Sequence, residues 1–77
     1  MEQKLKELMA NVFSIEISEI NPLSSPDSIP QWDSIGHLNL ITSIEEEFGI
    51  YFDEEQIIQM LNFQLVNEIT KEAISKK

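Results

Sequence analysis

The chain contains no cysteine, no arginine and only two glycines among its 77 residues. Without cysteine it can form neither a disulfide nor a zinc site with thiolate ligands. No apolar run approaches the roughly 18 residues that are needed to cross a bilayer. A core built from so short a chain leaves little room for a deep enzymatic cleft, and we expect residues 1–77 to form a single domain.

Basic residues are missing from the middle of the chain. All five are lysines near the two ends (Lys4, Lys6, Lys71, Lys76 and Lys77), whereas all of the 14 acids except Glu2 and Glu72 lie between residues 7 and 70. The net charge of −9 disfavours binding to nucleic acid or to anionic lipid and favours encounter with basic protein surfaces. An acidic face that binds no partner is the alternative.

The first residues, MEQKLKELMANVF, interleave acids and lysines with apolar side chains. A signal peptide has a continuous apolar segment instead. We therefore expect a cytoplasmic protein.

Four segments have the apolar spacing of helices. The first covers residues 2–13. The second covers about 34–48, starts after a capping Asp33 and stops at Gly49. A short helix near 54–60 follows Asp53, and a last helix follows Asn62. The side chains expected to face inward are Leu5, Leu8, Met9, Val12, Phe13, Leu38, Ile41, Ile44, Phe48, Ile57, Ile58, Met60, Leu65, Val66, Ile69 and Ala73.

Residues 14–32 lack this spacing and contain all three prolines, so they are expected to form a long connecting loop. The loop residues expected to be anchored in the core are Ile15, Ile17, Ile20, Leu23, Ile29 and Trp32. The sequence therefore predicts an all-α fold: a small four-helix bundle of three longer helices and one short helix, with a long loop between the first two.

The pair Asp33–Ser34 lies where this loop becomes a helix. The serine hydroxyl is expected to face solvent beside free backbone N–H groups, where a phosphate ester would be stabilised by the helix dipole. Gly36 follows within the first turn although glycine weakens a helix by about 1 kcal/mol. We interpret it as leaving room for a group attached to, or docking on, Ser34.

These residues resemble the acyl carrier proteins and the related peptidyl carriers, whose hallmark is an Asp-Ser-Leu motif at the start of the second helix. Here the motif is Asp33, Ser34 and Ile35, followed by GHLNLITSIEEEFGIYFDEEQI, and the resemblance covers almost the whole chain. It implies that Ser34 takes 4′-phosphopantetheine from coenzyme A through a magnesium-dependent phosphopantetheinyl transferase. The terminal thiol then carries an acyl or aminoacyl group as a thioester, and the carrier, expected to be a monomer, catalyses nothing.

The resemblance also implies roles for single residues. Asp33 would orient Ser34 and bind the metal of the transferase. Ile35 and Ile41 would form an apolar docking strip beside Glu45 and Glu46, which would bind basic patches on ligases, synthases and transferases. Independently, acids in the last turns of a helix oppose its dipole, and a broken stability rule of this kind points to function.

Four residues depart from the pattern of fatty-acid carriers: Ile35 conservatively replaces the usual leucine, Trp32 precedes the motif where smaller residues are typical, and Gly36 and Asn39 stand where acids are common. These departures leave the attachment site unchanged and favour a carrier of a specialised biosynthetic pathway over the housekeeping carrier of fatty-acid synthesis.

Other functions must be weighed against a carrier. His37 is three residues after Ser34 and can share its helical face, as in a Ser-His-Asp arrangement, but no oxyanion-hole signature accompanies it, and a position at the surface or at the rim of a site is favoured. The acid clusters lack the spacing of a calcium loop. The strongest rival is a small acidic helical adaptor that binds a basic partner without being modified.

Overall fold

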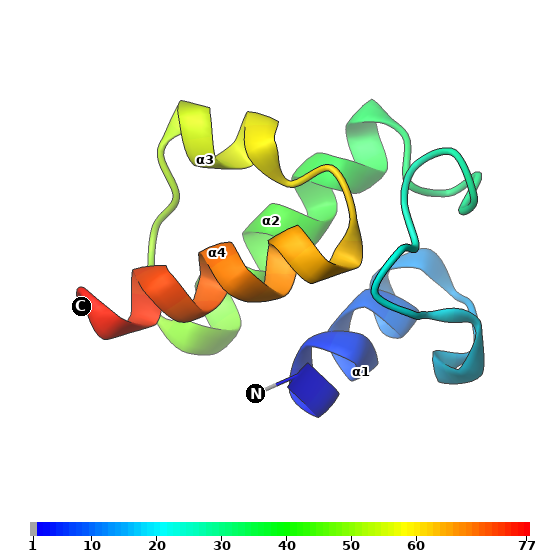
Figure 1. Cartoon of the computed structure of the whole chain (residues 1–77), viewed down its shortest axis with the longest axis horizontal. Helices are drawn as coiled ribbons and strands as arrows, with labels where there is room; N and C mark the ends of the chain where they lie inside the picture. Colours follow the sequence, from blue (N-terminus) through cyan, green and yellow to red (C-terminus); the bar gives the residue numbers. More distant parts are fainter. Residues whose placement is uncertain (1) are drawn as a thin grey trace.

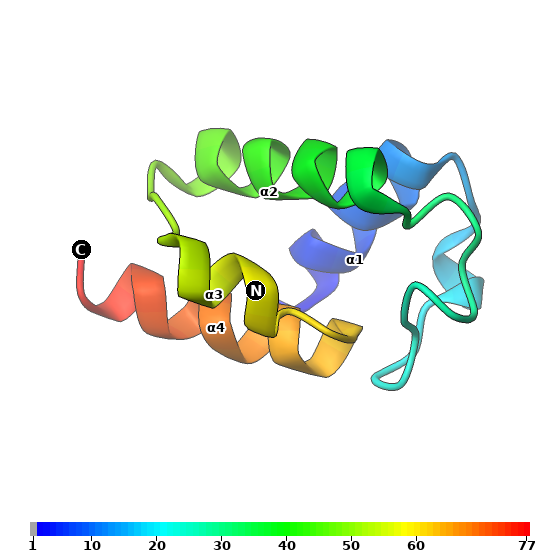
Figure 2. The same cartoon turned by 90° about the horizontal axis from the view of Figure 1, so that it is seen from above.

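The computed structural model describes residues 2–77. Helix α1 covers Glu2–Phe13, α2 covers Ser34–Phe48, α3 covers Glu54–Gln59 and α4 covers Phe63–Ser75, and a 3₁₀ turn, η1, covers Ile17–Glu19 (Figure 1). The described residues contain no strand. Seen from above, α2 lies along one side of the molecule and α4 along the other, with α3 beside them (Figure 2). The all-α prediction of three longer helices and one short one is confirmed.

Helix α2 begins and ends where the sequence predicted. The Asp33 carboxylate accepts a hydrogen bond from the Gly36 backbone N–H at 2.8 Å, which satisfies one free amide of the first turn. Gly49 ends the helix in the left-handed conformation at φ 63°. The Lys77 ammonium donates to the Phe48 carbonyl oxygen at 2.9 Å and adds a positive charge at the negative end of the dipole.

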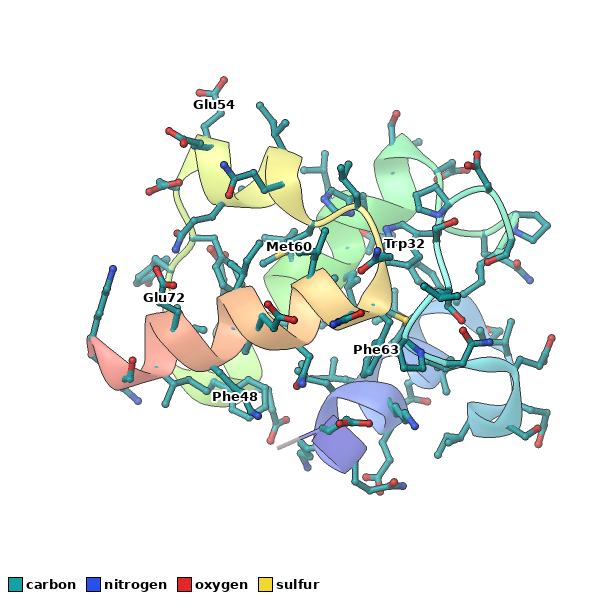
Figure 3. All side chains as sticks on the ribbon, viewed as in Figure 1. Trp32, Phe48, Glu54, Met60, Phe63 and Glu72 are labelled. Carbon is teal, nitrogen blue, oxygen red and sulfur yellow. The ribbon has the colours of Figure 1, made fainter. Side chains whose placement is uncertain are left out.

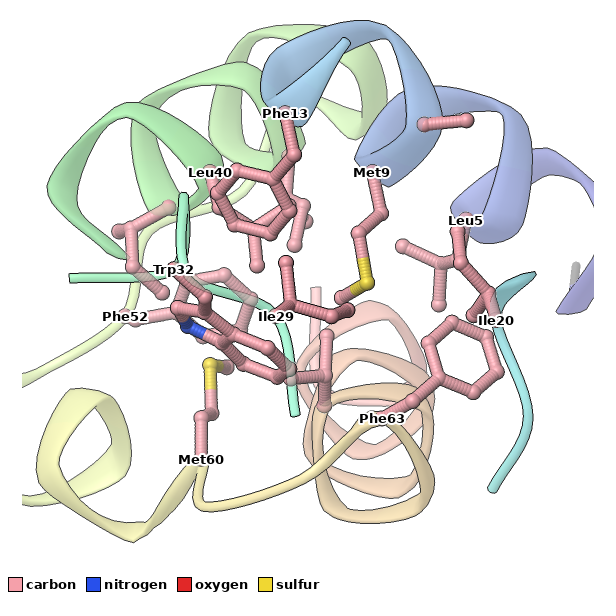
Figure 4. Close-up of a cluster of buried hydrophobic side chains, with 14 of the residues drawn as sticks. Leu5, Met9, Phe13, Ile20, Ile29, Trp32, Leu40, Phe52, Met60 and Phe63 are labelled. Carbon is pink, nitrogen blue, oxygen red and sulfur yellow. The ribbon is translucent and has the colours of Figure 1, made fainter. Parts of the chain in front are cut away.

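One apolar cluster lies between α1, α2 and α4, and side chains of the long loop pack into it (Figure 4). Its buried members are Leu5, Met9, Ala10, Phe13, Ile20, Ile29, Trp32, Leu40, Ile41, Ile44, Ile50, Phe52, Met60, Phe63 and Val66. Trp32, only 1% exposed, is a core residue, and its ring centroid lies 5.7 Å from that of Phe13. Aromatic pairs at this separation contribute beyond their buried area.

The inward face of α2 differs from the prediction. Leu38, expected to face inward, is 58% exposed, and Leu40 is buried in its place. The reason is rotational: Leu40 shares a face with Gly36 and Ile44, four residues away on each side, whereas Leu38 lies two residues and about 200° from it. The sequence contained both leucines but not the direction from which α1 and the loop approach.

The loop between α1 and α2 has two structural roles. Ile20 and Ile29 are buried in the core as predicted, whereas Ile17 and Leu23, the latter 76% exposed, are not. Backbone carbonyls near Leu23 explain the difference, because Phe63 N–H donates to the Ser24 oxygen at 2.8 Å and Gln64 N–H donates to the Pro22 oxygen at 3.0 Å. The loop therefore caps α4 as well as filling the core, and Leu23 lies on the outside of that cap.

Helix α3 is the element least attached to the core. Asp53 caps it through its carboxylate and Gln56 returns a side-chain bond, as a capping box requires. None of its own residues is buried, and Ile58, expected to pack inside, is exposed. Ile57, also expected to face inward, is partly buried against the core, and Met60, directly after the last residue of α3, is fully buried.

Ser14, which follows α1, adopts a left-handed conformation at φ 56°. A side chain in this region costs about 1 kcal/mol or more, and glycine removes that cost. We expect Ser14→Gly to raise the free energy of unfolding by about 1 kcal/mol, measured by urea denaturation. The matched variant Ser14→Ala keeps the Cβ atom and should gain nothing, so an equal gain in both would contradict this explanation.

Candidate functional site

Ser34 is the first residue of α2 and its side chain is exposed. Asp33 fixes the turn that presents it, because its carboxylate binds the Gly36 amide while its backbone oxygen accepts from His37 N–H at 2.8 Å. The hydroxyl therefore lies at a helix N-terminus, where backbone dipoles favour a negatively charged group. This is the position that the sequence predicted for Ser34.

An open groove of about 480 Å³ begins beside Ser34 and runs between the start of α2 and α3. The residues that line it are Pro26, Trp32, Asp33, Ser34, His37, Ile57, Ile58, Met60 and Leu61. Most of these side chains are apolar. In Figure 3, Met60 and Trp32 lie below α3, toward the rest of the bundle, whereas Glu54 points away from it. A hydroxyl at the edge of an apolar groove is a suitable attachment point for a long arm.

His37 lines the groove, so of the two positions that the sequence favoured, surface or rim, it takes the rim. Its imidazole is half-buried, and both ring nitrogens have partners: Nδ1 accepts from Trp32 Nε1–H at 2.8 Å, and Nε2 lies 2.9 Å from the Ile57 carbonyl oxygen. Neither nitrogen is therefore available to take a proton from Ser34. This contact argues against a Ser-His catalytic arrangement. Sequence reasoning missed the contact, although a histidine five residues after a tryptophan was a signal that could have raised it.

Gly36 faces the core and not the surface beside Ser34, so our interpretation of it was wrong. A Cβ atom at this position would overlap with the backbone carbonyl oxygen of Gln31 and would lie 3.1 Å from a ring carbon of Phe13. The glycine therefore lets the incoming loop cross directly against the first turn of α2.

The predicted docking strip is only partly at the surface. Ile35 is 71% exposed, but Ile41 is 4% exposed and packs in the core, so its predicted role in docking is wrong. Leu38, three residues after Ile35, takes the exposed position on that side of α2. The apolar surface next to Ser34 is thus formed by Ile35 and Leu38.

The three acids at the end of α2 have different surroundings. The Glu45 carboxylate accepts from Phe52 N–H at 2.9 Å and so holds the segment that leads to α3. Glu47 pairs with Lys4 of α1 at 3.3 Å. Glu46 is exposed and makes no ion pair within residues 2–77. Of the two predicted docking acids, Glu46 has a free carboxylate and Glu45 has a structural contact.

Two negative findings apply to residues 2–77. No three acidic or histidine side chains gather closely enough to hold a metal ion, and no helix is long and apolar enough to cross a membrane.

A curated protein from Mycoplasma pneumoniae, named acyl carrier protein homolog, is 36% identical to this chain over 76 residues, covering 96% of this chain and 88% of its own length. The chain belongs to the acyl carrier protein family. Members of this family are carriers and not catalysts, and the function of this chain is that of an acyl carrier protein. No protein-family model matches the sequence.

The fold comparison agrees with this membership. The solution structure of holo acyl carrier protein from Geobacter metallireducens superposes with a TM-score of 0.88 at 23% identity, covering 97% of this chain and 86% of that one. The four helices and the long first loop therefore form the acyl carrier protein fold.

Proposed function

We propose that Ser34 of this acyl carrier protein is the attachment site of 4′-phosphopantetheine, whose thiol carries acyl or aminoacyl groups as thioesters to partner enzymes. The observation that supports this most is the exposed hydroxyl of Ser34 at the first turn of α2, beside an apolar groove. The structural neighbour from Geobacter is a holo protein, which adds support for a prosthetic group.

The residues around Ser34 fit such a group. In the loading reaction the Ser34 oxygen forms a bond to the β-phosphorus of coenzyme A and gives up its proton, and 3′,5′-adenosine bisphosphate leaves. The remaining phosphodiester carries one negative charge, which the free amides of the α2 N-terminus favour. Asp33 holds those amides in place through its bond to Gly36. We propose that Asp33 also binds the metal of the transferase, as the family resemblance implies.

The test is the intact mass of the chain after incubation with coenzyme A, magnesium and a broad-range phosphopantetheinyl transferase. We expect a gain of one phosphopantetheine group per chain. An unmodified chain after incubation with several such transferases would leave the rival proposal, an acidic adaptor without an arm.

The cargo is proposed to belong to a specialised biosynthetic pathway. Support comes from Trp32 and Asn39, which depart from the fatty-acid carrier pattern. The indole of Trp32 is buried and occupies space between the helices. The loaded carrier should therefore be a poor substrate for the chain-elongating enzymes of fatty-acid synthesis and a good one for a dedicated ligase. Efficient elongation would instead favour the housekeeping alternative.

The two acids at the end of α2 give a matched test of docking. Glu46→Lys should slow modification of Ser34 several-fold at low salt, because the exposed carboxylate steers a basic enzyme surface. Its unfolding free energy should change by less than about 0.5 kcal/mol. Initial rates at low and high salt, followed by mass, measure the effect. Equal rates for wild type and Glu46→Lys at low salt would remove Glu46 from the docking surface.

Glu45→Lys has a different expected outcome. The substitution removes the hydrogen bond to Phe52 N–H and should cost about 1 kcal/mol of stability in urea denaturation. Of the two substitutions, only Glu46→Lys is therefore expected to leave the unfolding free energy unchanged. A stable Glu45→Lys variant would mean that the Phe52 amide finds water in place of the carboxylate.

A further inference from the structure

The contact between Trp32, His37 and Ile57 joins three elements beside the groove. Trp32 belongs to the end of the long loop, His37 to the first turns of α2, and Ile57 to α3. The indole and imidazole rings are nearly parallel, with an interplanar angle of 18°, which suits a hydrogen bond in the plane of both rings. Within residues 2–77, no other hydrogen bond joins α2 to α3.

These two contacts require one protonation state of His37. An indole N–H can only donate, so Nδ1 of His37 must be without a proton. In the neutral ring the proton is then on Nε2, where it is donated to the Ile57 carbonyl oxygen. A second proton on Nδ1 would face the Trp32 N–H, so two donors would meet and the buried indole would lose its acceptor.

Helix α3 is the element that such a loss would release. It has six residues, none of them buried, and its main attachments are the His37 bond, the partly buried Ile57 side chain and Met60. Local opening occurs first in segments with little buried surface. Ile57 and Ile58 of α3 form one side of the groove, and Ser34 and His37 form the other, so movement of α3 changes the width of the groove at Ser34.

We propose that His37 is a proton-controlled latch that holds α3 against the start of α2 and so sets the width of the groove beside Ser34. The neutral imidazole closes the latch, and protonation breaks the Trp32 bond and frees α3. The other ionisable groups on the packed elements are all acids: Asp33 lines the groove, α3 carries Glu54 and Glu55 after its capping Asp53, and the loop carries Asp27.

The sign of the effect follows from proton binding. An imidazole with protons on both nitrogens has no acceptor for the Trp32 N–H, so the doubly protonated ring opens the latch and the neutral ring closes it. The latch depends on contacts of the unmodified chain and not on attachment of an arm.

The chain has one tryptophan and one histidine, so NMR can follow both partners without ambiguity. In the unmodified wild type, the Trp32 Nε1–H resonance and the His37 ring protons should titrate with the same midpoint, and the protection of that N–H from exchange should fall roughly tenfold from pH 8 to pH 5. Amide resonances of α3 should move with them, and those of α1 should not.

The matched variant is His37→Gln, whose amide can accept from Trp32 with its oxygen and donate to Ile57 with its nitrogen but does not titrate. It should keep the Trp32 N–H protected at both pH values, and it corrects for titration of the carboxylates. Three results would overturn the latch: a Trp32 Nε1–H resonance that does not change with pH together with the His37 ring protons in the wild type, α3 amide resonances that do not shift, or the same pH response in His37→Gln. The mass test of Ser34 is unaffected by any of them, so the two proposals fail separately.

Discussion

Ser34→Ala is expected to gain no mass in the presence of coenzyme A, magnesium and a phosphopantetheinyl transferase, while the wild-type chain is fully converted. The substitution removes the only atom of that residue that can form the phosphodiester. It leaves the turn intact, because the helix cap is supplied by Asp33 and the Ser34 side chain makes no hydrogen bond within residues 2–77. The unfolding free energy should therefore stay within about 0.5 kcal/mol of wild type.

The control for this variant is another serine of the same helix. Ser43→Ala changes α2 by the same atom, about two and a half turns away, and should be modified at the wild-type rate. The cap gives a second comparison. Asp33→Ala should slow modification and also lower stability by about 1 kcal/mol, since the Gly36 amide loses its acceptor. Modification of Ser34→Ala to the wild-type extent would place the arm on another residue and overturn the proposed site.

Gly36→Ala is expected to destabilise the fold, although alanine favours a helix by about 1 kcal/mol over glycine. The added Cβ atom would overlap with the backbone carbonyl oxygen of Gln31, and hydrogen bonds hold the residues that follow Gln31 in place. Trp32 N–H is bonded to the Ile29 oxygen at 2.9 Å, and the Asp33 carboxylate is bonded to Gly36 itself, so the loop cannot withdraw without breaking the cap. An overlap of this kind costs about 3 kcal/mol, which leaves a net loss of about 2 kcal/mol.

Thermal and urea unfolding of Gly36→Ala measure this loss, which corresponds to a fall in midpoint temperature of roughly 10 °C for a domain of this size. Asn39→Ala is the matched variant, because Asn39 is exposed on the same helix and only the propensity gain applies there. It should be as stable as the wild type or slightly more so. If Gly36→Ala were stabilised as much as Asn39→Ala, the close crossing of loop and helix would be wrong.

Local chemistry explains why much of the fold could be predicted from the sequence. Asp33, Asp53 and Asn62 cap helices where they were expected, because a short side chain with an acceptor oxygen before an apolar repeat satisfies free amides within three residues. Gly49 stops α2 for an equally local reason, a positive φ angle. The position of Ser34 followed from the same signals, since it depends only on where α2 begins.

The errors have a common origin in contacts between distant segments. Leu38 and Ile41 differ by three residues and both fit an apolar stripe, yet one is exposed and the other buried. The bond from Glu45 to Phe52 and the bridge from Trp32 through His37 to Ile57 join residues that no periodicity relates. Each depends on the direction from which one element approaches another, which a linear pattern does not contain.

The sequence by itself determined the helices, their caps, the acidic middle of the chain and the serine at the start of α2, because these depend on interactions within a few residues or on total charge. Only the tertiary structure decided that Gly36 is a crossing point, that Ile41 is core and Leu38 surface, and that His37 joins α2 to α3. Those assignments require the relative placement of segments that are distant in the chain, such as His37 and Ile57, which are 20 residues apart. They arise from packing, which fixes the rotation of each helix about its axis once the core is filled.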